Sequence, residues 1–388
     1  MEKVKKARLK DKNWRLNHIY WIINRQKEKV KFKRNRAQIH FNEHKALRNI
    51  ILKSRRLGFT TDESIDTLDD CLFTPNFEGL LIAHKQEEAY KIFDRKVHFT
   101  WKNLFGNIPA EGNKAGSEDL KNLLWTVDTS RTNELKFGFP GGKDFSSMSV
   151  SNSGRSGTYN RVHISEFAKL CKMFPQTATE VITGTIPAVP PDGCVDIEST
   201  AQGEEGLFYE IFMEAWDRGE PKFPTQYKAH FYNWTWDDEE LAMITPEQAI
   251  EFLSSEDYTH KFADLKGSFK DYQERNQLTN RQITYYYTKW LSLNKKFYKL
   301  FQEYPFTVEE AFATSGNKLF DKSAVERQKQ YELEGEKVGN WIYYEDYKPG
   351  HTYAGAADVG HGVGLDSSTI VIMDFTPYKP KEIGRAHV

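Results

Sequence analysis

A basic turn that contains glycine, residues 53–61 (KSRRLGFTT), is the part of the chain best suited to hold a phosphate group. It follows an apolar run at 46–52 that predicts a buried strand, and it leads into a helical pattern at 61–71. A strand, a turn with free backbone N–H groups and a helix N-terminus together form a P-loop, which binds nucleotide phosphates. The segment therefore predicts a nucleotide-binding loop.

This loop departs from the GxxxxGK[ST] pattern at two positions. Gly58 and Thr60 match the second glycine and the hydroxyl that ligates Mg²⁺, whereas Phe59 occupies the lysine position and Lys53 that of the first glycine. The cation that contacts the phosphates must therefore come from another position. For this segment alone, an ordinary basic turn after a strand is an alternative interpretation.

A second candidate for chemistry is residues 161–166 (RVHISE), which read as a buried strand that ends in a carboxylate. In P-loop enzymes a strand beside the loop ends in acids, one for Mg²⁺ and one to position the attacking water. Ser165 stands in the place of the first acid and Glu166 in that of the second. Glu166 is therefore the candidate water-activating base, and a helix-capping Ser-Glu pair is the alternative.

The elements that would position these motifs alternate between short apolar strands and helices. The patterns predict strands at 46–52, 79–83, 135–139, 148–150, 161–164 and 194–197, and helices at 61–71, 87–97 and 175–185. Such alternation indicates an α/β fold with a mainly parallel sheet. Aromatic and acidic helical segments dominate 245–303, and strands return at 353–358 and 369–374.

The N-terminal residues 1–36 carry 14 Lys or Arg against three acids, although the net charge of the chain is −1. This polarity suggests an arm that contacts phosphate or another acidic surface, with a solvated charged helix as the alternative. Residues 14–24 (WRLNHIYWIIN) are an apolar island that predicts a helix docked on the body or on a partner.

Composition narrows the class of protein. The 388 residues suffice for one large domain or two ordinary ones, and 39% hydrophobic residues argue against a disordered chain. Cys71, Cys171 and Cys194 are widely spaced, so we expect neither a disulfide framework nor a zinc site. No apolar run is long enough to span a bilayer, and the N-terminus lacks the apolar stretch of a secretory signal.

Several motifs in a fixed order resemble the large subunit of tailed-bacteriophage terminases, the ATP-driven motors that package viral DNA. The basic loop, 154–158 (GRSGT), the Ser-Glu pair and 197–201 (IESTA) follow one another as in that family. Residues 301–316 (FQEYPFTVEEAFATSG) look very like the family's EYP…EEAF…SG segment. The resemblance implies an α/β P-loop ATPase of the additional-strand, catalytic-glutamate (ASCE) type with a helical lid subdomain.

The resemblance also assigns residues to ATP and Mg²⁺. The loop is similar to the family's K-x-R-Q-x-G-x-T-T form, which makes Lys53 the first choice for the phosphate cation and Arg55 or Arg56 the alternatives. It implies nucleotide contacts from the rest of the loop and from a sensing segment, namely Ser54, Leu57, Gly58, Phe59, Thr60, Thr61, Ser199 and Thr200, with Thr60 on Mg²⁺. Gln38 would contact adenine. Arg155 would neutralise γ-phosphate charge in cis or in trans, or else pair with an acid in a turn.

Residues 353–360 (YAGAADVG) are similar to the first strand of the terminase nuclease, which has an RNase H-like fold. Asp358 would belong to a carboxylate cluster that holds Mg²⁺ or Mn²⁺, with Asp366 as a secondary ligand. The other family carboxylates lie further downstream. Residues 382–388 (EIGRAHV) read like a translated sequencing adapter, so we expect a chain truncated inside the nuclease domain, with an isolated hairpin at 353–374.

The implied organisation is a basic arm (1–36), an ATPase core (37–233), a helical lid (234–320), a linker (321–345) and the start of the nuclease (346–388). The implied function is translocation of double-stranded DNA into a procapsid, with an endonuclease that cuts concatemeric DNA. Partners would be DNA, the portal protein, the small terminase subunit and further copies in a ring. The protein would act in the host cytoplasm and transiently at the portal, without entering a membrane or the mature virion.

Two other functions stay open on the sequence. A helicase-like or other P-loop ATPase would lack the packaging role. A non-enzymatic protein that binds DNA or the portal would keep the basic arm and have a degenerate P-loop, since Phe59 replaces the usual lysine.

Overall fold

The computed structural model describes residues 8–110, 116–153, 157–313, 334–358, 368–377 and 381–387. The chain divides into two compact units, Met1–Gly316 and Asn317–Val388. Within the described ranges no helix combines the length and the apolar character needed to cross a membrane. Each unit is described by itself below.

An eight-stranded sheet forms the centre of the first unit, in the order β10-β3-β9-β8-β4-β7-β6-β5. Neighbouring strands are parallel from β10 to β7, and β6 and β5 extend the sheet antiparallel. This confirms the α/β fold with a mainly parallel sheet. The strand bounds are β3 (Arg48–Lys53), β4 (Glu78–Ala83), β5 (Thr126–Arg131), β6 (Glu134–Gly138), β7 (Phe145–Ser151), β8 (Arg161–Ser165), β9 (Cys194–Ser199) and β10 (Lys228–Tyr232).

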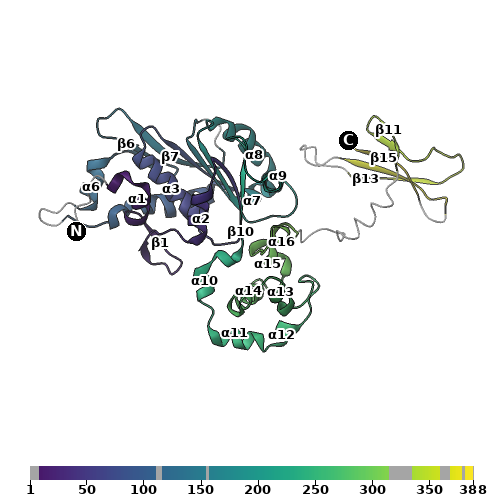
Figure 1. Cartoon of the computed structure of the whole chain (residues 1–388). Helices are drawn as coiled ribbons and strands as arrows, with labels where there is room; N and C mark the ends of the chain where they lie inside the picture. The colour runs from purple at the N-terminus through teal and green to yellow at the C-terminus, as the bar shows by residue number, and fades with distance from the viewer. Residues whose placement is uncertain are drawn as a thin grey trace. The chain divides into compact units, whose positions relative to one another are not determined.

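Helices cover both faces of this sheet, as Figure 1 shows. The bounds are α1 (Lys12–His18), α2 (Arg36–His44), α3 (Phe59–Phe73), α4 (Gln86–Ile92), α5 (Phe99–Lys102), α6 (Ser117–Leu124), α7 (Phe167–Met173), α8 (Pro175–Glu180) and α9 (Leu207–Arg218). Alternate residues of β4 point to opposite faces: Leu80 and Ile82 join the core under α7–α9, and Leu81 joins the core under α1 and α3. Two π-helical segments, Phe93–His98 and Val181–Thr185, continue α4 and α8.

The basic arm docks on an acidic face of α3. Arg15 forms a bidentate pair with the buried Asp69, at 2.8 and 2.6 Å. Arg34 bonds both Asp62 and Asp66, which are also buried. The charge of the arm suggested contact with phosphate or with another acidic surface. The structure shows the arm in contact with an acidic surface of its own chain. The apolar island is divided between α1 and the short strand β1 (Trp21–Ile23), which pairs with β2 (Lys29–Lys31).

A helical subdomain follows β10 and has an aromatic core that includes Trp234, Phe269 and Tyr286. Its helices are α10 (Asp238–Ala242), α11 (Pro246–Leu253), α12 (Glu256–Thr259), α13 (Phe269–Arg275), α14 (Asn280–Ser292) and α15 (Phe297–Glu303). The next helix, α16 (Val308–Phe312), returns to the core under α7–α9 through Val308 and Phe312. We refer to residues 234–303 as the lid.

The second unit is a five-stranded antiparallel sheet in the order β11-β12-β15-β14-β13. Its strands are β11 (Glu336–Val338), β12 (Trp341–Tyr343), β13 (Tyr353–Asp358), β14 (Thr369–Asp374) and β15 (Lys381–His387). The expectation of an isolated hairpin is wrong for the described residues, because β15 pairs with both β14 and β12. Two of these strands lie in the segment that the sequence suggested was a linker.

The buried His230 on β10 should make the stability of the sheet depend on pH. Its Nε2 lies 3.0 Å from Asn49 Oδ1, while the Asn49 amide donates to Ala46 O and Asp196 Oδ1. The oxygen of Asn49 must therefore accept from a His230 N–H. Burial, followed by the charge of Lys228, lowers the pKa of His230 to about 4.

As the pH falls, the His230 imidazole is protonated at a higher pH in the unfolded chain than in the folded one. The free energy of unfolding should therefore fall as the pH drops from about 6.5 toward 4. We expect His230 to account for about 2 kcal/mol of that loss between pH 7 and pH 5. Urea unfolding of the wild type and His230→Gln at both pH values measures the difference. An equal loss in the two proteins would contradict the assignment.

Candidate nucleotide-binding site

The segment between β3 and α3 joins the end of a parallel strand to a helix N-terminus, as a P-loop does. Gly58 precedes α3 in the left-handed region, with φ of 79°, which favours glycine. A Cβ at this position would lie 2.8 Å from Gln38 Nε2, so a larger residue would displace that side chain. Gly58 and the first residues of α3 line the cavity beside the loop, where a helix N-terminus favours an anion.

Phe59 explains why the usual lysine position holds no cation. Its side chain is fully buried, with its ring centroid 5.6 Å from that of Phe41 and 5.0 Å from that of Tyr232. Leu57 belongs to the same apolar cluster. The position therefore contributes to packing between α2, α3 and β10.

Phe59→Ala should lower the free energy of unfolding by about 3–4 kcal/mol, because it leaves a cavity in this cluster. Urea denaturation gives the value. Leu123→Ala is a matched control, since Leu123 is 65% exposed, and it should change stability by less than about 0.5 kcal/mol. A loss equally small for Phe59→Ala would show that the cluster does not hold the loop.

Lys53 at the end of β3 supplies a cation at the base of the loop. Its Nζ lies 3.3 Å from Glu166 Oε1 and 3.0 Å from Glu198 Oε2, and only 6% of its side chain is exposed. Burial alone would lower the pKa of Lys53, but the two carboxylates outweigh it and raise the pKa above its ordinary value. Lys53 is therefore charged at neutral pH.

Glu198 is the buried acid of the site, and the sequence interpretation did not single it out. It lies on β9, paired with Ser165 on β8 and with Ile51 on β3. Its Oε1 accepts hydrogen bonds from Thr60 Oγ1 at 2.6 Å and from Ser165 Oγ at 2.7 Å. Burial would raise the pKa of Glu198, but Lys53 and hydrogen bonding hold it well below its ordinary value.

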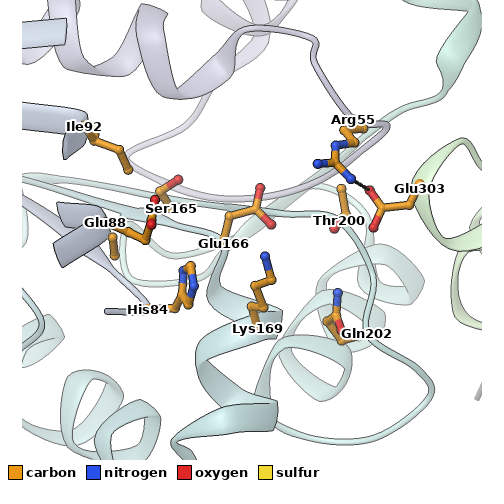
Figure 2. A pocket seen from close by; sticks show the side chains of 11 residues that line it. Arg55, His84, Glu88, Ile92, Ser165, Glu166, Lys169, Thr200, Gln202 and Glu303 are labelled. Atoms are coloured by element: carbon orange, nitrogen blue, oxygen red, sulfur yellow. Dashed lines mark hydrogen bonds and ion pairs between the residues drawn. The ribbon is translucent and has the colours of Figure 1, made fainter. Parts of the chain in front are cut away.

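Glu166 lies at the turn between β8 and α7 in the left-handed region, with φ of 57°. Its side chain is 29% exposed and extends into a pocket of about 230 Å³, which Figure 2 shows from close by. Arg55, Lys169 and Thr200 line the same pocket. Glu166 therefore combines contact with Lys53 and access to solvent, as a residue that positions water requires.

A larger cavity of about 800 Å³ lies over the loop, within the range of cofactor sites. Gln38, Gly58, Thr60 and Thr61 line it together with Lys53 and Glu166. From the arm, Ile22, Ile23, Asn24 and Phe32 also line the cavity. From the π-helical segment after α4, the cations Arg95 and Lys96 line it. None of these six was predicted. Burial, with the charge of Arg95, lowers the pKa of Lys96.

Gln38 is buried at the edge of this cavity and caps the N-terminus of α2. Its Oε1 accepts from Asn35 N at 2.8 Å, and its Nε2 donates to Gly58 O at 2.8 Å. An amide has two donors and two acceptor positions, so one of each is still available to a base. Contact with adenine stays a prediction.

Two arginines of the loop extend to acids of the lid. Arg55 pairs with Glu303 at 3.2 Å, and Arg56 pairs with Glu240 at 3.3 Å. The Glu303 carbonyl also accepts from Arg55 N at 2.9 Å and from Ser54 Oγ at 3.1 Å. The EYP segment, whose role the sequence left unexplained, therefore holds the backbone of the loop.

The sensing segment contacts the helix that follows Glu166. Ser199 is buried, and its Oγ accepts from Ala168 N on α7 at 3.1 Å. Thr200 lines the pocket that Glu166 enters. A shift of β9 would therefore displace the start of α7 and the adjoining turn that carries Glu166, the candidate base.

Three further residues were predicted to take part in catalysis or metal binding: Arg155, Asp358 and Asp366. Arg155 and Asp366 fall outside the described residues. Asp358 ends β13 in the second unit, on a strand that is mostly exposed. Among the described residues, no three His, Cys, Asp or Glu side chains come together in a group that could hold a metal ion.

No protein-family model matches the sequence, and a search of curated proteins finds no match. Among solved structures, the chain is similar to the large terminase ATPase domain of Thermus phage P74-26, with 19% identity over 57% of this chain and 92% of that one and a TM-score of 0.41. The large terminase of a thermophilic bacteriophage in complex with ATP-gamma-S is 12% identical over 92% and 68%, with a TM-score of 0.36. A DEAD box protein of Methanococcus jannaschii is 13% identical over 62% and 61%, with a TM-score of 0.28.

Proposed function

We propose that this chain is an ATP-hydrolysing motor of the terminase large-subunit kind, which drives double-stranded DNA into a procapsid. The observation that carries the ATPase part is the meeting of Lys53, Thr60 and Glu166 beside one cavity, at the carboxyl ends of β3 and β8. Ligands of parallel α/β sheets bind at this edge. The packaging part rests on the order of the motifs along the sequence.

In this proposal ATP enters as its Mg²⁺ complex, in which the ion neutralises charge on the β- and γ-phosphates. The α3 N-terminus and the loop amides that follow Arg55 bind the phosphates, since the amides of Ser54 and Arg55 donate to Tyr232 O and Glu303 O. The Lys53 ammonium group leaves the two glutamates and pairs with the phosphates instead. The Glu166 carboxylate is then free to orient a water. Arg95 and Lys96, like charges in one cavity, would be stabilised by the same anion.

Three oxygens of the site suit Mg²⁺, which prefers hard oxygen ligands and keeps contacts to phosphate and water. Thr60 Oγ1, Ser165 Oγ and Glu198 Oε1 lie within 3.4 Å of one another. Thr60 is the proposed protein ligand. Because Mg²⁺ in such sites needs few protein ligands, the proposal requires no cluster of three acids.

The partners and the nuclease belong to the same proposal. The proposed partners are DNA, a portal, a small subunit and neighbouring copies of the chain in a ring. The assembled motor would act in the host cytoplasm. Asp358 and Asp366 would be the first acids of a Mg²⁺- or Mn²⁺-dependent nuclease. Arg155 would stabilise γ-phosphate charge in its own or a neighbouring subunit.

Purified protein should bind a fluorescent ATP analogue in the presence of Mg²⁺, hydrolyse ATP, and hydrolyse it faster with linear double-stranded DNA. Thr60→Val keeps the shape of the side chain and should reduce hydrolysis on the order of tenfold or more, because the hydroxyl ligand is lost. Absence of nucleotide binding would favour a degenerate binding protein. Hydrolysis that DNA does not alter would favour an ATPase without a packaging role.

A further inference from the structure

We propose that Glu198 does the work of the Mg²⁺-associated aspartate that β8 lacks, as a positioning residue behind Thr60 and Ser165. This inference rests on the proposed ATPase function and deepens it. The usual acid precedes the catalytic glutamate on its own strand. Here that position is Ser165, and the carboxylate is supplied by its registered partner on the neighbouring strand β9.

The hydrogen bonds of Glu198 set the orientation of both hydroxyl groups. Glu198 Oε1 has no proton to donate, so the 2.6 Å bond from Thr60 and the 2.7 Å bond from Ser165 fix both hydroxyl protons on it. The lone pairs of the two hydroxyl oxygens are then free to face a cation. Carboxylates that orient a metal's ligands in this way typically change metal affinity by about 10- to 100-fold.

The charge of Glu198 also needs a cation nearby. The side chain is fully buried, and an uncompensated buried carboxylate costs several kcal/mol. Lys53 Nζ compensates it, at 3.0 Å from Oε2, an atom that has no hydrogen bond of good geometry. If Lys53 moved to bind the phosphates, Mg²⁺ held by Thr60 would supply the compensating positive charge beside Glu198.

The two glutamates therefore have separate tasks. Glu166 is 29% exposed and can reach a water in the pocket, whereas Glu198 is 0% exposed and accepts from Thr60 and Ser165. Loss of Glu198 should weaken metal binding, and loss of Glu166 should slow hydrolysis. A direct measurement of metal affinity separates these effects.

The test is a titration of Mn²⁺, followed by electron paramagnetic resonance, into protein saturated with ATPγS. Glu198→Gln keeps the shape and removes the charge. We expect its Mn²⁺ affinity to fall about 10- to 100-fold, while ATPγS affinity in EDTA stays within a few-fold of wild type. Glu166→Gln is the matched control and should keep the Mn²⁺ affinity. Ser165→Asp in the Glu198→Gln background should restore most of the loss, because it returns a carboxylate to β8.

Mn²⁺ affinity of Glu198→Gln within threefold of wild type would overturn the inference, and so would an equal loss in Glu166→Gln. If Glu198→Gln does not fold, as a thermal melt reveals, Glu198→Asp replaces it. That variant keeps the charge and withdraws it from the hydroxyls, so unchanged Mn²⁺ affinity would also overturn the inference. Failure of the wild type to bind any nucleotide would instead overturn the proposed function and this inference together.

Discussion

Glu166→Gln should leave ATP binding intact and slow hydrolysis by about two to four orders of magnitude, the contribution typical of a general base. The glutamine keeps the size of the side chain but cannot accept a proton from water. The left-handed turn holds the side chain at the pocket beside Lys53, and α7 is anchored to β9 through Ser199. Single-turnover hydrolysis and the affinity for a fluorescent ATP analogue give the two quantities separately.

Glu88→Gln is the control for this experiment. Glu88 lines the same pocket and pairs at 2.8 Å with Lys91, which lies on the same helix, α4. Hydrolysis by Glu88→Gln should stay within a few-fold of wild type. If Glu166→Gln also stays there, Glu166 is not the base.

Lys53→Met should abolish ATP affinity and hydrolysis together, because the charge contacts phosphate in both the ground state and the transition state. It should also lower the free energy of unfolding by about 3 kcal/mol, since Glu198 would lose its buried partner. Calorimetric ATP binding and urea unfolding measure the two losses. The double variant Lys53→Met/Glu198→Gln should recover stability without recovering ATP affinity.

Arg55→Ala and Arg56→Ala decide between the three candidate cations. Both side chains are more than half exposed and pair with lid acids, so we expect modest losses of ATP affinity. If either variant abolishes binding while Lys53→Met leaves it unchanged, Lys53 is not the phosphate cation.

The strands with continuous apolar runs could be predicted from the sequence, and the edge strand β10 could not. Ile50 to Leu52 and Leu80 to Ile82 are fully or almost fully buried, so their patterns were unambiguous. In β10 the sequence KAHFY mixes polar and apolar residues and offers no continuous apolar run, and only His230 and Tyr232 are buried in the fold. Period-2 patterns identify such an edge strand only when the partner strand is known.

Residues of the candidate site could be predicted from the sequence where they belong to a motif. Residues that only tertiary structure brings to the site could not. Lys53 and Glu166 follow from motif positions. Asp196 and Glu198 alternate with apolar residues along β9, a pattern that usually indicates a face exposed to water. Here that face lies under α3, and the acids of α3, Arg34 of the arm and Arg161 of β8 accompany it. Burial of such a polar face depends on tertiary pairing that one strand's sequence does not contain.

The contacts between the loop and Glu303 join nucleotide binding to the position of the lid. Three interactions hold Ser54 and Arg55 to this residue. Where bound phosphate alters those interactions, linkage requires the effect to be reciprocal: the free energy that ATP contributes to lid placement equals the free energy that lid placement contributes to ATP binding. If the proposed motor binds ATP in a way that strengthens these contacts, a mechanical load that draws the lid away from the loop would lower the affinity for ATP, and ATP affinity would then depend on the tension on the DNA.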